Sequence, residues 1–196
     1  MDKQNVRLHL IEIGAKAFMA KGYHAVGLKE ILAAAQVPKG SFYYYFRSKE
    51  DFCIAIIDHY IRLYAERHLT ILFDSARPVR DRLLAFFAQE KEYFREKQCQ
   101  HGCLLAKLAL EMALLSEPIR AELQRGMNGW IRTVAACLAE GEAADEFTLF
   151  RPPAVMAEFL YAAWAGAITR MQATQSLEPL DIFISFAARE IGGQPS

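Results

Sequence analysis

Residues 39–49 bring positive charges, tyrosines and small side chains close together in the sequence. A short helix predicted over 41–46, with its flanking residues, would expose on one side Lys39, Ser41, Tyr43, Tyr44 and Arg47. Such side chains suit a DNA groove, and short residues such as Gly40 and Ser41 let backbone N–H groups approach a phosphate. Lys49 would lie in the first turn of the next helix, where the helix dipole disfavours a cation, so a phosphate partner would explain its position. The segment therefore predicts contacts with a polyanion.

The elements that would position these residues are a helix, a tight turn and a second helix. Residues 28–35 predict a short helix and 37–40 a turn, and two short helices joined by about four residues is the spacing of a DNA-reading helix-turn-helix. Its apolar residues would pack on a first helix over 4–21, and they are Ile31, Leu32, Val37, Phe42 and Phe46. The first helix offers an apolar stripe of Leu8, Ile11, Ala15 and Phe18. The alternative is that the aromatic helix is only a core element, but three consecutive tyrosines cannot all be buried on one narrow helix.

Charge is unevenly distributed along the chain. The 196 residues carry 23 basic and 23 acidic side chains, so the formal net charge is zero. Residues 1–49 hold eight basic and three acidic side chains, a balance of +5, and the rest of the chain has a balance of −5. A basic N-terminal segment on an acidic body again points to a polyanion at the N-terminal end.

Cys103 is the residue best suited to covalent chemistry. It follows Gly102 and would open a helix, whose N-terminal N–H groups favour the thiolate, the form that reacts with electrophiles and oxidants. His101 and Lys107 would add positive charge nearby. The alternative is that Cys103 is a small buried hydrophobic residue.

The other cysteines form no metal-binding pattern. Cys99, His101 and Cys103 have no fourth ligand and no second cysteine pair, so no metal is expected. Cys53 and Cys137 lie in predicted helix interiors and are expected in the core. No phosphate-binding loop or dinucleotide motif is present, so no cofactor is expected.

The second half of the chain supplies bulky side chains that could line a cavity for a small effector. The bulky set is Phe86, Phe87, Tyr93, Phe94, Met112, Trp130, Tyr161, Trp164 and Met171, and the effector candidates among them are Phe86, Met112, Trp130, Tyr161 and Trp164. Aromatic stripes of this kind are more often part of a core. Arg170 stands out because the rest of its helix is mainly small and apolar, and a half-buried Arg needs an anion, which could be Glu111, Glu158 or an acidic ligand.

The whole chain has the pattern of an all-α protein of about nine helices, without strand-like alternation. We expect a helix-turn-helix domain over 1–48 and a helical body over 49–196. Two helices at about 154–174 and 179–191 carry small residues and an apolar stripe, which would let two copies form a two-fold four-helix interface. The alternative is an ordinary core within one chain.

Residues 37–50 resemble the signature of the TetR family of transcriptional repressors. The stretch reads Val37-Pro38-Lys39-Gly40-Ser41-Phe42-Tyr43-Tyr44-Tyr45-Phe46-Arg47-Ser48-Lys49-Glu50. Tyr44 stands where that family often has His, and Gly27-Leu28 where Thr is common, and both departures bear on the choice of operator. The resemblance implies a three-helix DNA-binding domain and a helical body that binds a ligand and dimerises through its last two helices. It also implies DNA contacts at Leu28, Lys29, Lys39, Gly40, Ser41, Tyr43, Tyr44 and Lys49.

A second resemblance concerns a subgroup of that family. Residues 102–108 and 176–180 resemble the members that control detoxification of reactive electrophiles, among them the repressor of N-ethylmaleimide reductase and the acrylate-responsive repressors. The electrophile-sensing members carry a cysteine at the position of Cys103. The N-ethylmaleimide-type member has a lysine near Gln172 that this chain lacks. Arg170 and Trp130 resemble positions of the acrylate-type members.

These patterns predict a homodimeric repressor that a small effector, or modification of Cys103, releases from a palindromic DNA operator. One alternative is a repressor gated only by non-covalent binding of a small organic acid near Arg170, and a more remote one is a helical detoxification enzyme. No catalytic triad order is present, so no enzyme is expected. An architectural DNA-binding protein would not need the large aromatic body. No apolar run reaches the roughly 18 residues of a membrane span, so we expect no membrane partner and a cytoplasmic location.

Overall fold

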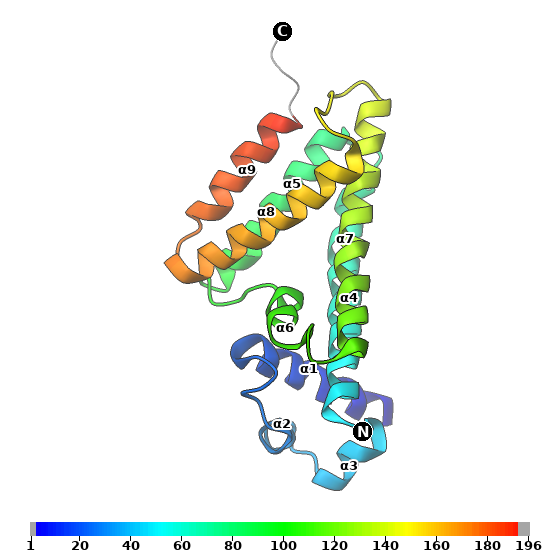
Figure 1. Cartoon of the computed structure of the whole chain (residues 1–196), viewed down its shortest axis with the longest axis vertical. Coiled ribbons are helices and arrows are strands. Elements are labelled where there is room, and N and C mark those ends of the chain that lie inside the picture. The colour runs from blue at the N-terminus through cyan, green and yellow to red at the C-terminus, as the bar shows by residue number, and fades with distance from the viewer. Residues whose placement is uncertain (1–2, 192–196) are drawn as a thin grey trace. The chain divides into compact units, whose positions relative to one another are not determined.

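The structure, a computed structural model, describes residues 3–191, and only the backbone of residues 3, 4 and 69 (Figure 1). The outermost residues of both expected domains, 1–2 and 192–196, lie outside this range. The described chain forms α-helices without a strand, which confirms the predicted all-α class. The helices are α1 (Lys3–Lys21), α2 (Leu28–Ala35), α3 (Lys39–Tyr45), α4 (Lys49–Leu72), α5 (Val79–Glu96), α6 (Leu104–Met112), α7 (Glu117–Ala143), α8 (Pro153–Thr174) and α9 (Glu178–Glu190).

Helix boundaries follow local capping chemistry. Ser48 accepts a hydrogen bond from the Asp51 N–H at 3.0 Å, and the Asp51 carboxylate accepts one from the Arg47 N–H at 2.9 Å, so this pair caps α4. Ser116 caps α7 by accepting the Ile119 N–H at 3.2 Å. The predicted bounds of α2 and α8 are confirmed, whereas α3 begins two residues earlier than predicted, at Lys39.

The described residues fall into two compact units. The first contains the chain up to Tyr64 together with Cys103–Met127, and the second contains Ala65–Gly102 together with the chain from Asn128 onward. Packing therefore divides the chain differently from the expected functional boundary at residue 48, because α6 and the start of α7 pack with the N-terminal helices. The helices α4 and α7 each continue from the first unit into the second.

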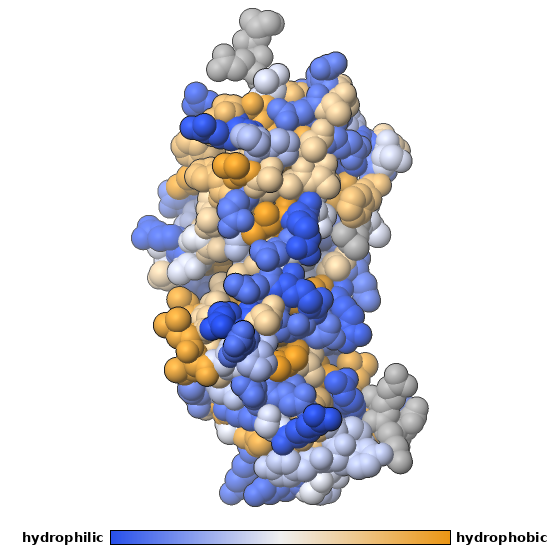
Figure 2. Space-filling model, turned by 45° about the vertical axis from the view of Figure 1, so that its right-hand side comes forward, coloured by the Kyte–Doolittle hydropathy of each residue, from blue (hydrophilic) through white to orange (hydrophobic). Residues whose placement is uncertain are grey.

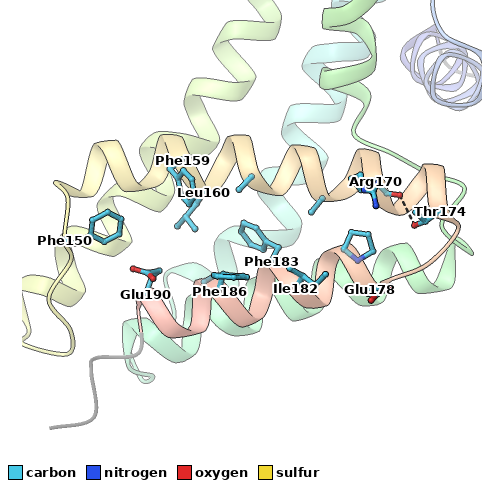
Figure 3. Close-up of a pocket in the computed structure, with 14 residues that line it drawn as sticks. Phe150, Phe159, Leu160, Arg170, Thr174, Glu178, Ile182, Phe183, Phe186 and Glu190 are labelled. Atoms are coloured by element: carbon cyan, nitrogen blue, oxygen red, sulfur yellow. Dashed lines mark hydrogen bonds between the residues drawn. The ribbon is translucent and has the colours of Figure 1, made fainter.

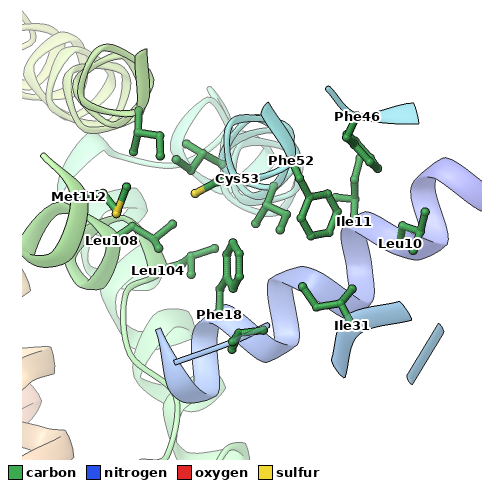
Figure 4. Close-up of a cluster of buried hydrophobic side chains, with 14 of the residues drawn as sticks. Leu10, Ile11, Phe18, Ile31, Phe46, Phe52, Cys53, Leu104, Leu108 and Met112 are labelled. Atoms are coloured by element: carbon green, nitrogen blue, oxygen red, sulfur yellow. The ribbon is translucent and has the colours of Figure 1, made fainter. Parts of the chain in front are cut away.

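The core of the first unit supports the helix-turn-helix (Figure 4). Ile31, Leu32, Phe42 and Phe46 are buried as predicted, while Val37 is half-buried. The stripe predicted on α1 is wrong at Leu8, which is 42% exposed, whereas Leu10 is fully buried. The buried side of α1 instead centres on Gly14, where a Cβ would lie 2.4 Å from the Phe52 ring. The absence of a side chain at Gly14 therefore lets α1 and α4 approach closely.

Contacts from α6 tie down the end of α1. Lys107 donates hydrogen bonds from Nζ to the carbonyl oxygens of Met19 at 2.7 Å and Ala20 at 3.2 Å, which would otherwise be unsatisfied at the helix C-terminus. Glu111 accepts a hydrogen bond from the His24 N–H at 3.0 Å and packs against Gly22, whose φ is +85°. Both side chains therefore hold α6 against the connection between α1 and α2.

In the second unit, α8 and α9 lie side by side, and α5 packs against α9 (Figure 1). An ionic cluster joins α4, α5 and α7. The buried Arg82 of α5 donates hydrogen bonds to the carbonyl of Leu72 in α4 and to both carboxylate oxygens of Glu140 in α7. Glu146 accepts the Val79 and Arg80 N–H groups at 2.9 and 3.1 Å and so caps α5. None of the described helices is long and apolar enough to span a membrane.

Candidate DNA-binding and effector sites

A tight connection joins α2 to α3. Gln36 adopts a left-handed conformation with φ 55°, and its N–H donates to the carbonyls of Ala33 and Leu32. The Val37 N–H also donates to the Leu32 carbonyl, at 3.0 Å, so the end of α2 is satisfied before the chain turns. Pro38 then precedes α3 with φ −62°, and the Ser41 N–H donates to its carbonyl. The predicted helix, turn and helix are thereby confirmed.

One side of α3 is anchored and the other is exposed. Phe42 is fully buried, and its ring packs against the rings of Phe46 and Phe52 with centroids 5.3 and 5.4 Å apart. Tyr43 and Tyr44, by contrast, are 57% and 65% exposed. The other predicted contacts Lys29, Lys39 and Gly40 are exposed, and Leu28 and Ser41 are partly exposed. Figure 1 shows α2 and α3 joined by their short connection.

Lys49 differs from the other predicted DNA contacts. Its Nζ donates a hydrogen bond to the Tyr23 carbonyl at 2.5 Å and lies 4.3 Å from the centre of the Tyr23 ring. Burial lowers the pKa of Lys49. The ammonium group therefore ties α4 to the loop before α2 through one of its three N–H donors.

The second unit contains a connected cluster of aromatic rings. Phe86 lies 6.0 Å from Trp130, measured between ring centroids, and Trp130 lies 5.4 Å from Tyr161. Trp164 joins them through Phe87, with centroids 5.3 Å apart. Four of the predicted effector residues therefore come together from α5, α7 and α8. Phe87, which the sequence also offered among the bulky side chains of this region, links them.

Two other predicted effector residues lie elsewhere. Met112 is buried in the core of the first unit, beside Leu104 and Leu108, and so belongs to a different unit from the aromatic cluster (Figure 4). Arg170 is exposed rather than half-buried, and it lines a groove between α8 and α9. Among the described residues, neither Glu111 nor Glu158 lies within 4 Å of the Arg170 guanidinium, so the ion pairs predicted for Arg170 are not formed.

A buried polar pair beside the aromatic cluster was missed. The His68 Nε2 and Glu90 Oε1 atoms lie 2.9 Å apart, and their side chains are 2% and 4% exposed. The His68 ring packs edge-on against Phe86, with centroids 5.1 Å apart. Burial of such a pair costs desolvation energy that its interaction must offset. The signal in the sequence was only a polar residue on each of two otherwise apolar helix faces.

The four cysteines are thiols that differ in exposure. Burial raises the pKa of Cys53 to about 12 and also raises that of Cys137, so both are neutral near pH 7. Cys99 is buried too, whereas Cys103 is partly exposed and forms the N-cap of α6. Cys103 is therefore the most accessible thiol among the described residues.

Of the two residues expected to supply positive charge near Cys103, His101 is neutral near pH 7 and Lys107 binds backbone carbonyls. Burial and the neighbouring Lys97 lower the pKa of His101, so its imidazole is neutral near pH 7. The His101 Nδ1 atom lies 3.1 Å from the Tyr93 hydroxyl, within hydrogen-bond distance. The Lys107 ammonium, as described above, binds backbone carbonyls of α1. Cys103 itself has the position predicted for it, at the N-terminus of α6, and a helix N-terminus favours a thiolate.

The groove between α8 and α9 has a volume of about 590 Å³. Several large apolar side chains on these helices reach the surface, since Phe159 and Phe186 are 62% and 61% exposed and Ile182 is 51% exposed. Patches of hydrophobic residues are visible on the face of the molecule in Figure 2, among hydrophilic ones. The two helices predicted to dimerise thus carry an exposed apolar surface in the single chain.

A helix-turn-helix joined by two continuous helices to a second, aromatic-rich helical unit defines a transcription regulator with a sensory domain. Comparisons with known proteins agree. Residues 10–56 match the model of the bacterial regulatory proteins of the tetR family, and residues 79–187 match that of the tetracyclin repressor-like C-terminal domain. The chain belongs to the TetR family of transcriptional regulators.

Individual relatives extend over nearly the whole chain. The chain is 36% identical to the transcriptional repressor NemR of Escherichia coli K12 over 91% of this chain and 90% of that protein. It is 35% identical to the transcriptional repressor DhaR of Mycobacterium sp. strain GP1, over 94% and 91%. The crystal structure of E. coli NemR in its reduced form superposes with a TM-score of 0.89 at 34% identity, covering 94% of this chain and 96% of that one.

Proposed function

We propose that this protein is a homodimeric transcriptional repressor that a small electrophile releases from its operator by reacting with Cys103. The single observation that carries the DNA-binding part is the two-sided structure of α3. Phe42 holds this helix on the core while Tyr43 and Tyr44 remain exposed, so the helix is rigidly placed and its polar side is available to a DNA groove. The relatives named NemR and DhaR are repressors, which supports repression here.

We assign Lys39, Ser41 and Tyr44 to base edges, and Tyr43 to a phosphate. Leu28, Lys29 and Gly40 would contact the DNA around them. Removal of one good base contact costs about 1–3 kcal/mol of binding energy. Because Lys49 binds the Tyr23 carbonyl, we give it the role of positioning α4 in the free protein, and its remaining N–H donors could contact a phosphate of bound DNA.

Dimerisation through α8 and α9 follows from the exposed apolar surface of these helices. A single recognition helix binds DNA weakly, and two of them on a two-fold axis read two half-sites one helical turn apart. The exposed aromatic rings of Phe159 and Phe186 would lose water contact in such an interface, which favours association.

The electrophile would act on Cys103. In the proposed step, the Cys103 thiolate adds to an alkene carbon that is β to a carbonyl group of a maleimide or an enal: the S–C bond forms, the C=C π bond breaks, and the resulting enolate takes a proton from water. The contrast among the cysteines supports this choice, because the raised pKa values keep Cys53 and Cys137 protonated while Cys103 is partly exposed at a helix N-terminus.

Coupling to DNA would run through α4 and α7. Both helices are continuous from the unit that carries α3 into the unit that carries the aromatic cluster. A shift of either helix would therefore displace residues in both units. A coupling energy of about 1–3 kcal/mol would lower operator affinity by roughly 5–150-fold. The effector must bind or modify the DNA-free conformation preferentially, because otherwise no signal is transmitted.

The test is a fluorescence-anisotropy titration of the full-length protein on labelled DNA from upstream of its own gene, with and without N-ethylmaleimide. Cys103→Ser is the test variant and Cys99→Ala, which removes a buried thiol, is the matched control. We expect N-ethylmaleimide to weaken DNA binding of the wild type and of Cys99→Ala at least fivefold, and to leave Cys103→Ser unchanged.

Two results would overturn parts of this proposal. If Cys103→Ser is released like the wild type, Cys103 is not the sensor, and a non-covalent effector at the aromatic cluster around Trp130 and Tyr161 becomes the better explanation. If no sequence-specific DNA binding is found at moderate salt, the repressor function itself is refuted.

A further inference from the structure

The charged residues of the groove between α8 and α9 lie at its two ends, and apolar side chains line its centre. Arg170 lies at one end of the groove with Thr174 and Glu178, and Glu190 lies at the other end with Phe150 (Figure 3). Between them the groove is lined by aliphatic and aromatic side chains, including Phe159, Phe183 and Phe186. The groove thus has an apolar centre and charged ends.

These groove charges have no ionic partner within the described part of their own chain. No carboxylate there lies within 4 Å of the Arg170 guanidinium, and no cation lies within 4 Å of Glu178 or Glu190. Asp181, one turn after Glu178 on α9, is different, because it pairs with Lys91 of α5. The acids of α9 are therefore divided into one that stabilises the chain itself and two that remain available in the groove.

If a second copy of this chain packed on α8 and α9, the Arg170 guanidinium would lose contact with water. Covering the exposed apolar side chains of α8 and α9 would also remove water from the guanidinium, which is costly for an unpaired charge. A two-fold interface is self-complementary, so a residue that contacts a partner residue does so twice. Arg170 and the acids lie on the same surface patch, so the patch carries both charges that such pairing needs.

We propose that Arg170 of each protomer pairs with a groove carboxylate of the second copy, Glu178 or Glu190, and that these two ion pairs select the homodimer. This inference rests on the proposed dimer and deepens it, because it names the residues that choose the partner. It also replaces the predicted role of Arg170 in binding an acidic effector, since the arginine lies on the exposed groove surface. Regulators with the same apolar helices but without matching charges would be rejected as partners, because juxtaposed like charges are strongly unfavourable.

The experiment uses charge reversal in the full-length protein. Arg170→Glu places like charges opposite each other twice in its homodimer, and Glu178→Arg or Glu190→Arg does the same with positive charges. A mixture of Arg170→Glu with the correct reversed acid restores both pairs, because each protomer then supplies the opposite charge. Arg132→Glu, which reverses an exposed cation of α7 outside the groove, is the matched control.

Dimerisation is measured by sedimentation velocity over a concentration series, and mixed dimers by energy transfer between differently labelled protomers. We expect the dimer dissociation constant of Arg170→Glu to rise at least tenfold, that of Arg132→Glu to stay within about twofold of wild type, and one of the two mixtures to return to within about threefold of wild type. The mixture that recovers identifies the acid.

Three outcomes would contradict the inference. If Arg170→Glu dimerises like wild type, Arg170 takes no part in partner selection, although the proposed dimer and repressor stand. If Arg170→Glu is impaired but neither mixture recovers, the arginine acts without a groove carboxylate. If wild type is a monomer at the concentrations that bind DNA, the proposed dimer fails as well, and the groove has another occupant.

Discussion

Substitutions two residues apart on α3 should separate folding stability from DNA binding. Phe42 and Tyr44 are both aromatic and belong to the same short helix, but the first is fully buried and the second is 65% exposed. We expect Phe42→Ala to lower the free energy of unfolding, and Tyr44→Ala to leave it nearly unchanged while DNA binding is weakened.

The magnitudes follow from burial. Loss of a fully buried Phe side chain costs about 3–5 kcal/mol, from the lost apolar transfer energy and the cavity left among its neighbours. Phe42 packs against two other rings at centroid distances of 5.3 and 5.4 Å, which leaves little freedom to fill that cavity. An exposed residue such as Tyr44 usually changes stability by no more than about 0.5 kcal/mol. If Tyr44 contacts a base, its loss removes about 1–3 kcal/mol of operator binding.

Urea unfolding followed by circular dichroism measures the first quantity, at one fixed protein concentration because dimerisation would add to stability. Fluorescence anisotropy with operator DNA measures the second. The reasoning is refuted if Tyr44→Ala binds the operator like wild type, or if it loses more than about 1 kcal/mol of unfolding free energy. Phe42→Ala with unchanged stability would equally contradict the assignment of Phe42 as the anchor of α3.

Three further predictions concern packing, pH and thiol chemistry. Gly14→Val should lower the unfolding free energy by about 1–3 kcal/mol in urea, since the new side chain would overlap the helix packed against Gly14; unchanged stability would mean that the helices are not in close contact. The hydrogen bonds from Arg82 hold the pKa of Glu140 below its usual value of 4.5, so the stabilisation is present above that pH and is lost as the pH falls through the lower, folded value. Glu140→Gln should therefore be less stable than wild type at pH 7, and the difference should shrink below pH 4.5 in urea titrations; a difference that is constant with pH would exclude the ion pair as its cause. N-ethylmaleimide at pH 7 should modify Cys103 first and leave Cys53 unmodified until the protein unfolds, because burial raises the pKa of Cys53 to about 12. Peptide mapping at successive times measures this order, and early modification of Cys53 would contradict it.

Local sequence signals predicted the helices well. The spacing of Ser48 and Asp51 and the prolines before α8 identify helix starts by chemistry that acts within a few residues, and the structure uses those same groups. Local signals did not predict which side of α1 is buried. Leu8 and Leu10 are equally apolar, and the choice between them depends on where Gly14 lets α4 approach, which is a contact between residues far apart in the sequence.

The candidate effector site was predicted only in part for the same reason. Phe86, Trp130, Tyr161 and Trp164 are large and apolar, so burial next to one another was a reasonable expectation. Met112 has the same character, but its helix packs with the N-terminal helices. The type of a residue indicates that its side chain will be buried, but it does not indicate in which of the two units.

The burial and the partners of charged residues were predicted least well from the sequence. Arg170 was expected to be half-buried because its helix is apolar, but that apolar surface remains exposed in the single chain. His68 and Glu90 pair across two consecutive helices, α4 and α5, and no pattern within either helix marks such a pair. Partners of charges are set by tertiary or quaternary contacts, which a single sequence does not display.

We propose above all that the exposed side of α3 reads a specific DNA sequence. The most direct measurement is the affinity of the full-length protein for DNA from upstream of its own gene, compared with a scrambled duplex of the same length and composition, by fluorescence anisotropy at about 150 mM salt. We expect a dissociation constant of about 10⁻⁸ M or lower for the upstream DNA and at least 10³-fold weaker binding to the scrambled duplex. Equal affinity for both duplexes would contradict sequence-specific reading by α3.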